Sequence, residues 1–278
     1  MMVTMSSFTS PSNPRIKQIR ALAQHKQRRK TGLGVAEGIF HVGEALAAGV
    51  ITYLVYAPDM LISPFGRELV DKAAAAQIPV YPVSAEVMSS IADKDNPQGL
   101  LAVVQQRHTR LDEFSAAAHP WLVAIVTPQD PGNLGTILRT IDAVGASGLV
   151  LLDGGVDPYH PSAIRAGMGA TFRIPVAAAA WSPFAAWAHA GGYHIYGTSA
   201  HGRTDYRHAG VYTAPLILLL GSEREGLSAE QVAVCDDLLR LPMHGHVRSL
   251  NLAVAAGVFL YAIHDNLVEQ AVIETTAA

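Results

Sequence analysis

A turn followed by a polar helix start occurs at residues 128–140, PQDPGNLGTILRT. Pro131 and Gly132 predict the turn, and Asn133 can cap the helix that follows. Free N–H groups at such a helix start suit an anion or a sugar hydroxyl. Arg139 lies one and a half turns further on, and the apolar stripe of this helix leaves it pointing away from the core. Taken alone, the segment also fits an ordinary strand-to-helix turn with a surface arginine.

A second segment, LILLLGSEREGLS at residues 216–228, brings an apolar strand into Gly221. A glycine there lets the backbone approach a ligand. Three successive charges, residues 223–225, then follow at the carboxyl end of a buried strand, where α/β sheets bind ligands. The segment lacks the Lys-Ser/Thr pair of a P-loop and the spacing of a dinucleotide fingerprint. The alternative is a solvated loop in which Ser228 caps the next helix.

In a third segment, residues 241–263, Ser249 and Asn251 open an apolar helix that we expect to reach about Gln270. Capping by Ser249 would explain the first of these polar residues. It does not explain Asn251, because a buried amide needs hydrogen-bond partners.

The elements that must position these segments are short apolar strands separated by helix-length pieces. From Trp121 onward five such strands predict a buried parallel sheet: WLVAIV, GLVLLD, YHIYGT, LILLLG and LLRLPM. Upstream, a helix over 14–29 is followed by alternating strands and helices, which predict a small α/β domain. The expected strands are Ile51–Tyr56, Val80–Val83 and Leu100–Val104, and the expected helices are Ile39–Ala48, Arg67–Ala76 and Ser84–Ile91.

These patterns predict a flexible tail over residues 1–13, a first domain over 14–106, a linker over 107–120 and a second domain over 121–278. Half of the residues are hydrophobic and 15% are charged, as in a globular protein. No uninterrupted apolar run approaches the roughly 18 residues of a membrane span, and the N-terminus does not resemble a signal peptide. The single Cys235 excludes an internal disulfide. We therefore expect a cytoplasmic protein.

The net charge of -3 hides an uneven distribution. Residues 1–110 hold 12 Lys and Arg against 8 Asp and Glu, whereas the remainder holds 8 against 15. Such a basic end predicts contact with a polyanion, although a solvated helix face is the alternative. Seven cations occupy sixteen residues with no acid among them: Arg15, Lys17, Arg20, Lys26, Arg28, Arg29 and Lys30.

In order and spacing, the three segments together resemble the signature segments of the SpoU/TrmH branch of the SPOUT RNA methyltransferases. The resemblance runs from about Trp121 to Ile263, and VDPYHPSAIRAGMGATFRIPV at residues 156–176 is similar to the stretch after the family's first segment. Residues 13–46 resemble the start of the family's substrate-binding domain, a small fold like that of ribosomal protein L30. The resemblance thus implies an L30e-like α/β domain followed by a parallel-sheet SPOUT domain with a deep trefoil knot.

The same resemblance implies methylation of a ribose 2'-hydroxyl in structured RNA, with S-adenosylmethionine as the cofactor. Ribosomal RNA is the first expectation; a tRNA ribose methyltransferase, a base methyltransferase and a catalytically inactive RNA-binding SPOUT protein are the alternatives. Family members pair through the knotted domain, so we expect a homodimer. The implied catalytic set is Asn133, Arg139, Glu223, Ser249 and Asn251, and the implied cofactor set is Thr198, Gly221, Leu241, Met243 and Leu250.

Two departures from the family pattern lie beside the site. His246-Val247-Arg248 precedes Ser249, and Ser222 stands where Asn is common. Arg248 joins the RNA-binding prediction, with a plain surface arginine as the alternative. His244 and His246 lack a nearby carboxylate or cysteine, so no metal is expected. A guanidinium keeps its proton in proteins, so our hypothesis is that Arg139 acts as an electrostatic clamp on RNA, and not as a base.

Overall fold

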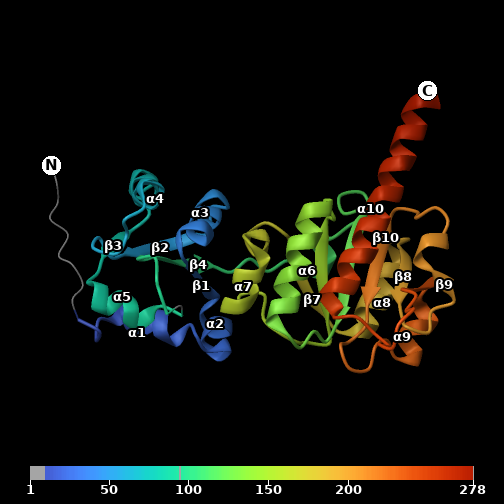
Figure 1. The fold of residues 1–278 in the computed structure, drawn as a ribbon, viewed down its shortest axis with the longest axis horizontal. Coiled ribbons are helices and arrows are strands. Elements are labelled where there is room, and N and C mark those ends of the chain that lie inside the picture. Colours follow the sequence, from blue (N-terminus) through green and yellow to red (C-terminus); the bar gives the residue numbers. More distant parts are fainter. Residues whose placement is uncertain (1–9, 94, 278) are drawn as a thin grey trace. The chain divides into compact units, whose positions relative to one another are not determined.

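A computed structural model describes residues 10–93 and 95–277, with side-chain burial described up to Gln270. The chain forms two compact units, each of which is described by itself. Unit 1 comprises Met1–Arg107 and Asp157–Arg173, and unit 2 comprises His108–Val156 and Ile174–Ala278 (Figure 1). Residues 1–9 of the tail that the sequence predicts lie outside the described residues.

Unit 1 is a mixed four-stranded sheet in the order β1-β4-β2-β3, with helices on both faces. Alternating residues of β4 point to opposite faces: Leu100, Ala102 and Val104 pack with α3 and α4, whereas Leu101 and Val103 pack with α1 and α5. The elements are α1 (Pro14–Ala21), α2 (His25–Thr31), β1 (Leu33–Glu37), α3 (Ile39–Ala47), β2 (Ile51–Tyr56), α4 (Pro64–Ala75), β3 (Val80–Pro82), α5 (Ala85–Ile91), β4 (Leu100–Gln105), α7 (Pro161–Gly167) and the 3-10 turn η2 (Ala170–Phe172).

The expected helix over residues 14–29 is in fact two helices, α1 and α2, with a break after Leu22. The α2 helix ends at Gly32, which adopts a left-handed conformation with φ 65°. Strand β1 was not expected, because five residues that include Gly34 carry a weak strand pattern. The structure gives that glycine a packing reason, since a Cβ there would lie 3.1 Å from the Tyr159 ring.

The segment Asp157–Arg173 belongs to unit 1, although the sequence placed it in the second domain. Arg28 of α2 donates to Asp157 at 2.6 Å, and the Arg107 N–H donates to the Tyr159 hydroxyl at 2.8 Å. Two further ion pairs tie the segment to unit 1: Arg165 with Asp93 and Arg173 with Glu44. These partners lie far apart in sequence, so no local pattern could have indicated them.

Unit 2 is a seven-stranded sheet in the order β7-β6-β5-β10-β8-β11-β9, and every strand pair is parallel. The predicted parallel sheet is therefore confirmed. The elements are the 3-10 turn η1 (Leu111–Glu113), β5 (Trp121–Val126), α6 (Pro131–Val144), β6 (Gly148–Leu152), β7 (Val176–Ala179), α8 (Trp181–Ala190), β8 (His194–Thr198), β9 (Thr204–Asp205), η3 (Tyr206–His208), β10 (Leu216–Leu220), α9 (Ala229–Val234), β11 (Asp237–Arg240) and α10 (Leu252–Ala277).

Strand order in unit 2 reverses between β5 and β10. Strands β6 and β7 extend the sheet on one side of β5, while β8, β11 and β9 extend it beyond β10. The crevice at such a reversal, outside the carboxyl ends of the strands, is where open α/β sheets bind ligands. The segments that contain Asn133 and Glu223 follow β5 and β10, so both start at this crevice.

Two stretches of unit 2 differ from the sequence-based expectation. Residues after His108, expected as linker, belong to this unit: Phe114 is buried in its core, and Thr109 bridges to Ala177 of β7. Strands β7 and β9 were also missed, because one is mostly alanine and the other has two residues.

Helix α10 is the longest helix described. It packs on α6 and buries Ala256, Phe259, Leu260 and Ile263. By length and composition alone, Leu252–Gln270 could also cross a membrane, although the sequence analysis found no uninterrupted apolar run that approaches the roughly 18 residues of a span. Such a test is also passed by soluble helices that pack against a core or a partner.

Candidate active site

The first segment forms its helix start differently from the expectation. Asp130, not Asn133, is the N-cap of α6: its carboxylate accepts the Asn133 N–H at 2.6 Å. Pro131 occupies the first helical position, where its missing N–H costs nothing. An Asp directly before a Pro at a helix start was the signal for this cap in the sequence. Because Asp130 caps the helix, the Asn133 side chain is free for other contacts.

The Asn133 side chain joins the three segments that the sequence singled out. Its Nδ2 donates to Glu223 Oε1 at 2.5 Å, and its Oδ1 accepts from Asn251 Nδ2 at 3.0 Å. A carboxylate only accepts hydrogen bonds, so Glu223 fixes which end of the Asn133 amide faces it. The relay Glu223–Asn133–Asn251 thus links residues that are 90 and 118 positions apart in the chain.

Asn251 also explains how the long C-terminal helix begins. Its Oδ1 accepts from the N–H groups of Ala253 at 2.9 Å and Val254 at 3.3 Å, as an N-cap does. The helix therefore starts at Leu252, and Ser249, which the sequence proposed as the capping residue, lies in the exposed stretch before it. One amide thus both caps α10 and holds Asn133. Asn251 is exposed, so the expectation of a buried amide was wrong, although its side chain does have hydrogen-bond partners.

The loop after β10 is a tight turn. Ser222 and Gly226 exchange two backbone hydrogen bonds of 3.0 Å, and Ser222 Oγ accepts the Glu225 N–H at 3.1 Å. Gly221 is buried beneath this turn, and a Cβ there would lie 2.4 Å from the Gly226 carbonyl carbon. The missing side chain is therefore needed for the return of the loop itself. Ser228 caps α9, as the alternative interpretation proposed.

Arg139 lies on the exposed face of α6, as predicted. Within the described residues, the Arg139 guanidinium makes no hydrogen bond or ion pair, so it is not held by the relay. The structure therefore leaves Arg139 available to a ligand.

The predicted cofactor residues follow three neighbouring strands. Thr198 ends β8, and its hydroxyl donates to the Leu219 carbonyl of β10 at 3.1 Å. Gly221 follows β10, while Leu241 and Met243 follow β11 and are half-buried. The register pairs Gly197 with Leu219 and Thr198 with Leu239, so these strand ends are level. Leu250 is 40% exposed.

This set fits S-adenosylmethionine, since half-buried apolar side chains and backbone groups at strand ends suit an adenine ring and a methionine chain. Gly221 packs so closely against Gly226 that there is no room for a Cβ, and this close packing keeps the loop near the strand ends. A metal site has no support within the described residues, where no group of three or more candidate ligands occurs.

A cavity of about 390 Å³ that was not predicted is lined in part by the turn that carries Glu223, through Ser222, Arg224, Glu225 and Gly226. Thr127 and Asp153 line it from the ends of β5 and β6, and both adopt left-handed backbone, with φ 42° and 55°. Non-glycine residues in that conformation carry strain that clusters at functional sites. No sequence pattern indicated this strain. The lining is Val126, Thr127, Gln129, Asp153, Ser222, Arg224, Glu225, Gly226, Ser228 and Gln231, which includes none of the predicted cofactor residues.

One of the predicted RNA-binding residues is wrongly assigned. Arg28 is 1% exposed and donates to Asp157 and to the carbonyls of Leu22 and Ala23. It therefore holds unit 1 together and cannot reach RNA. The local sequence misled because the acid that pairs with Arg28 lies 129 residues away.

The other basic residues of α1 and α2 are exposed. Arg15 stacks over the Tyr81 ring at 4.4 Å, and Arg20 donates to Ser90 Oγ at 2.7 Å. The remaining four side chains make no ion pair within the described residues: Lys17, Lys26, Arg29 and Lys30. Arg248 of unit 2 is also exposed.

Replacing Arg28 with alanine should lower the free energy of unfolding of unit 1 by about 3 kcal/mol, because a largely buried Asp157 would lose its counter-charge. Urea denaturation followed by circular dichroism measures this change. Arg29→Ala, one position along on the exposed side of α2, is the matched control and should have little effect. Equal stability of both variants would show that the buried pair contributes nothing.

The fold is an open parallel α/β sheet with a polar relay at the strand-order reversal. The chain lacks the glycine patterns of proteins that bind nucleotide phosphates. The SpoU rRNA Methylase family model matches residues 120–261, and a model of the MRM3-like substrate binding domain matches residues 13–102. The chain belongs to the SpoU rRNA methylase family.

Relatives of this chain match it over nearly its whole length. An AdoMet-bound rRNA methyltransferase from Sinorhizobium meliloti has a TM-score of 0.85 and 38% identity, covering 94% of this chain and 98% of its own. The 23S rRNA (guanosine(2553)-2'-O)-methyltransferase RlmP of Bacillus subtilis is 30% identical over 92% of this chain and 98% of its own. The SpoU methyltransferase AviRb from Streptomyces viridochromogenes, in complex with AdoMet, has a TM-score of 0.82 and 27% identity, covering 92% of this chain and all of its own.

Proposed function

We infer that this protein transfers the methyl group of S-adenosylmethionine to a ribose 2'-hydroxyl of ribosomal RNA. The observation that carries the proposal is the Glu223–Asn133–Asn251 relay, which joins the three family segments by hydrogen bonds at one crevice. The named activities of the relatives, 2'-O-methylation of 23S rRNA, give the substrate class.

The cofactor supplies an electrophilic methyl group when bound, and the chain must orient and activate a hydroxyl that is a poor nucleophile while it keeps its proton. Glu223 and Asn133 offer an acceptor and an amide at the crevice, and they orient the ribose. Arg139 holds the neighbouring phosphate and stabilises the alkoxide that develops, which is positional and electrostatic catalysis. Ser249 lies on the exposed stretch before α10. In this proposal it completes the pocket.

A methyl-transfer assay tests this function. The purified protein, tritiated S-adenosylmethionine and unmodified ribosomal RNA should yield labelled RNA, and the product linkage should resist alkaline cleavage. Transfer RNA in a parallel reaction tests the second substrate class. Cofactor binding without transfer to either RNA would instead support an inactive RNA-binding protein, and an alkali-sensitive product would point to base methylation.

The exposed cations of α1 and α2 form the proposed RNA-binding surface of unit 1: Arg15, Lys17, Arg20, Lys26, Arg29 and Lys30. Arg248 is a separate proposed RNA contact, in unit 2. This surface would hold phosphates and carry no sequence information. It supports the proposal because a chain with net charge -3 otherwise repels a polyanion.

The double variant Lys26→Ala/Lys30→Ala should weaken RNA binding at all sequences and reduce the slope of log K against log salt by about 1 to 2. Fluorescence anisotropy with a labelled ribosomal RNA fragment at several salt concentrations measures both. Arg67→Ala, on α4 of the same unit, is the control, because its guanidinium donates to the Leu61 carbonyl. An unchanged slope in the double variant would remove these lysines from the surface.

The finer features of the family belong to the same proposal: an L30e-like fold for the N-terminal domain, a deep trefoil knot in the catalytic domain, a homodimer and a cytoplasmic location. Support for the dimer comes from α10, whose Val254 and Tyr261 are 54% and 50% exposed although apolar. Such side chains would be covered by a second copy. Sedimentation equilibrium should give twice the chain mass, and a monomer would count against this interface.

A further inference from the structure

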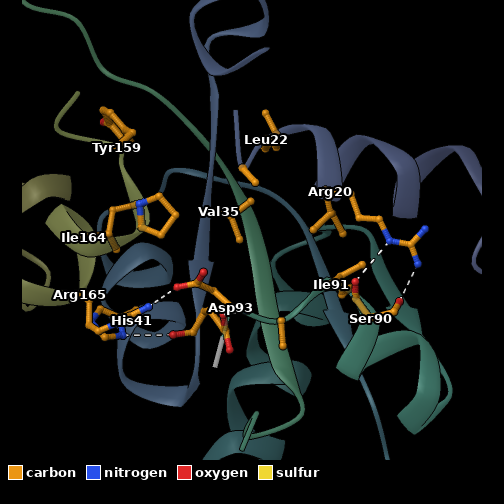
Figure 2. A pocket seen from close by; sticks show the side chains of 15 residues that line it. Arg20, Leu22, Val35, His41, Ser90, Ile91, Asp93, Tyr159, Ile164 and Arg165 are labelled. Carbon is orange, nitrogen blue, oxygen red and sulfur yellow. Dashed lines mark hydrogen bonds and ion pairs between the residues drawn. The ribbon is translucent and has the colours of Figure 1, made fainter. Parts of the chain in front are cut away.

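A cavity of about 210 Å³ lies within unit 1, whereas the segments that carry the proposed chemistry belong to unit 2. Figure 2 shows it between α1, β1, the end of α5 and the α7 segment. At about 30 Å³ for each molecule of liquid water, it would hold on the order of seven waters. It is smaller than the roughly 300 Å³ at which sites for drug-sized ligands begin. The space therefore suits a single small ring system.

The walls of the cavity are mostly apolar. Ile19 and Leu22 of α1, Val35 of β1, Ile91 of α5 and Ile164 of α7 line it, as Figure 2 shows for four of these five. Apolar walls favour an organic ring over a hydrated ion. A free phosphate is disfavoured for a second reason, because two carboxylates, Glu37 and Asp93, also line the space.

Several polar groups that line the cavity are already held in place. Arg20 donates to the Ser90 hydroxyl at 2.7 Å, and Arg165 is ion-paired with Asp93. Glu37 Oε2 accepts the Asp93 N–H at 2.7 Å, whereas its buried Oε1 has no hydrogen-bond partner among the described residues. A buried carboxylate oxygen without a partner costs free energy, which an N–H donor on a ligand would recover.

The same helices present the cations that the proposed function assigns to RNA phosphates. Helix α1 provides one wall of the cavity through Ile19, Arg20 and Leu22, and Ala23 follows directly at the rim. Lys17 and Lys26, both exposed, flank these residues in the chain. An RNA strand held along α1 and α2 would thus pass a cavity that accepts a planar ring with N–H donors.

We propose that this cavity of unit 1 receives one unstacked nucleobase of the substrate RNA, with its N–H edge toward Glu37. The proposal rests on the proposed function for its choice of ligand. Sequence-specific proteins read unpaired RNA bases in this way, by enclosing the ring and hydrogen-bonding its edge. Because α7 provides part of the wall, Tyr159, Pro161, Ile164 and Arg165 give the Asp157–Arg173 segment a role in substrate selection.

The test compares labelled single-stranded oligoribonucleotides of mixed sequence with abasic ribose-phosphate strands of the same length, using fluorescence anisotropy and the full chain. The wild-type protein should bind the base-containing strand about tenfold tighter. Ala23→Trp, which places a ring at the exposed rim, should lose this preference while its affinity for the abasic strand stays unchanged. Val35→Phe fills the cavity from β1 and should act in the same way.

Ala74→Trp is the matched control, because Ala74 is an exposed helical alanine of the same unit outside the cavity. It should keep the wild-type preference. If Ala23→Trp and Val35→Phe also keep it, or if the wild-type protein shows none, the cavity is not a base site. Methyl transfer to ribosomal RNA, assayed in parallel, separates the two proposals. Methyl transfer without a base preference would overturn only the proposed base site. A base preference that depends on the cavity, without methyl transfer, would overturn only the proposed function.

Discussion

Arg139→Ala should lower kcat for methyl transfer to ribosomal RNA about a thousandfold, the upper end of what one electrostatic contact to a developing oxyanion contributes. The reason is that Arg139 is an exposed cation on α6 and makes no hydrogen bond or ion pair within the described residues, so its removal breaks no contact in the free protein. The Kd for S-adenosylmethionine and the unfolding free energy should stay unchanged. Single-turnover kinetics and calorimetry measure these quantities.

Arg139→Lys distinguishes a clamp from a simple positive charge. A lysine keeps the charge but loses the planar fork that contacts two oxygens at once. It should therefore recover only part of the lost rate. Full turnover by Arg139→Lys would make bidentate geometry irrelevant, and comparable transfer by Arg139→Ala would remove the residue from catalysis. Arg240→Ala, a change of the same type on an exposed strand residue, is the control.

The sequence predicted those parts of the fold that depend on local pattern. Strand β10, LILLL, is buried at every position, which an uninterrupted apolar run indicates for a parallel sheet. The same holds for β5, and the ordered segments after these two strands indicated the site. The resemblance implied a catalytic set of five residues, and the structure brings three of them, Asn133, Glu223 and Asn251, within hydrogen-bond distance. Arg139 and Ser249 have no hydrogen bond to these three within the described residues.

What the sequence could not predict depends on contacts between distant residues. Arg28 looked like one of seven equivalent cations, because its partner Asp157 lies in a segment that was assigned to the other domain. The assignment of the α6 cap failed for a different reason: both Asp130 and Asn133 can cap a helix, and only the backbone shows which one does. The cavity of unit 1 likewise requires α1, β1 and α7 together.

Gly221→Ala should strongly weaken the binding of S-adenosylmethionine and, with it, reduce methyl transfer. The added Cβ would lie 2.4 Å from the Gly226 carbonyl carbon and 2.6 Å from the Leu227 nitrogen. Both are backbone atoms, so no rotamer change can relieve the overlap, and the turn that carries Glu223 must move. We expect at least a hundredfold weaker binding, because a loop displaced by about 1 Å loses roughly that factor in a preorganised site.

The control is Gly43→Ala in α3 of unit 1, where the new methyl group would make ordinary contacts of 3.5 and 3.8 Å with Leu69. It should leave cofactor binding unchanged and should stabilise the helix by up to about 1 kcal/mol. Isothermal titration calorimetry with S-adenosylmethionine, together with thermal unfolding of both variants, separates a lost site from a lost fold. Wild-type affinity in Gly221→Ala would mean that the turn after β10 tolerates displacement, and the strand ends at β8 and β11 would then have to hold the cofactor without it.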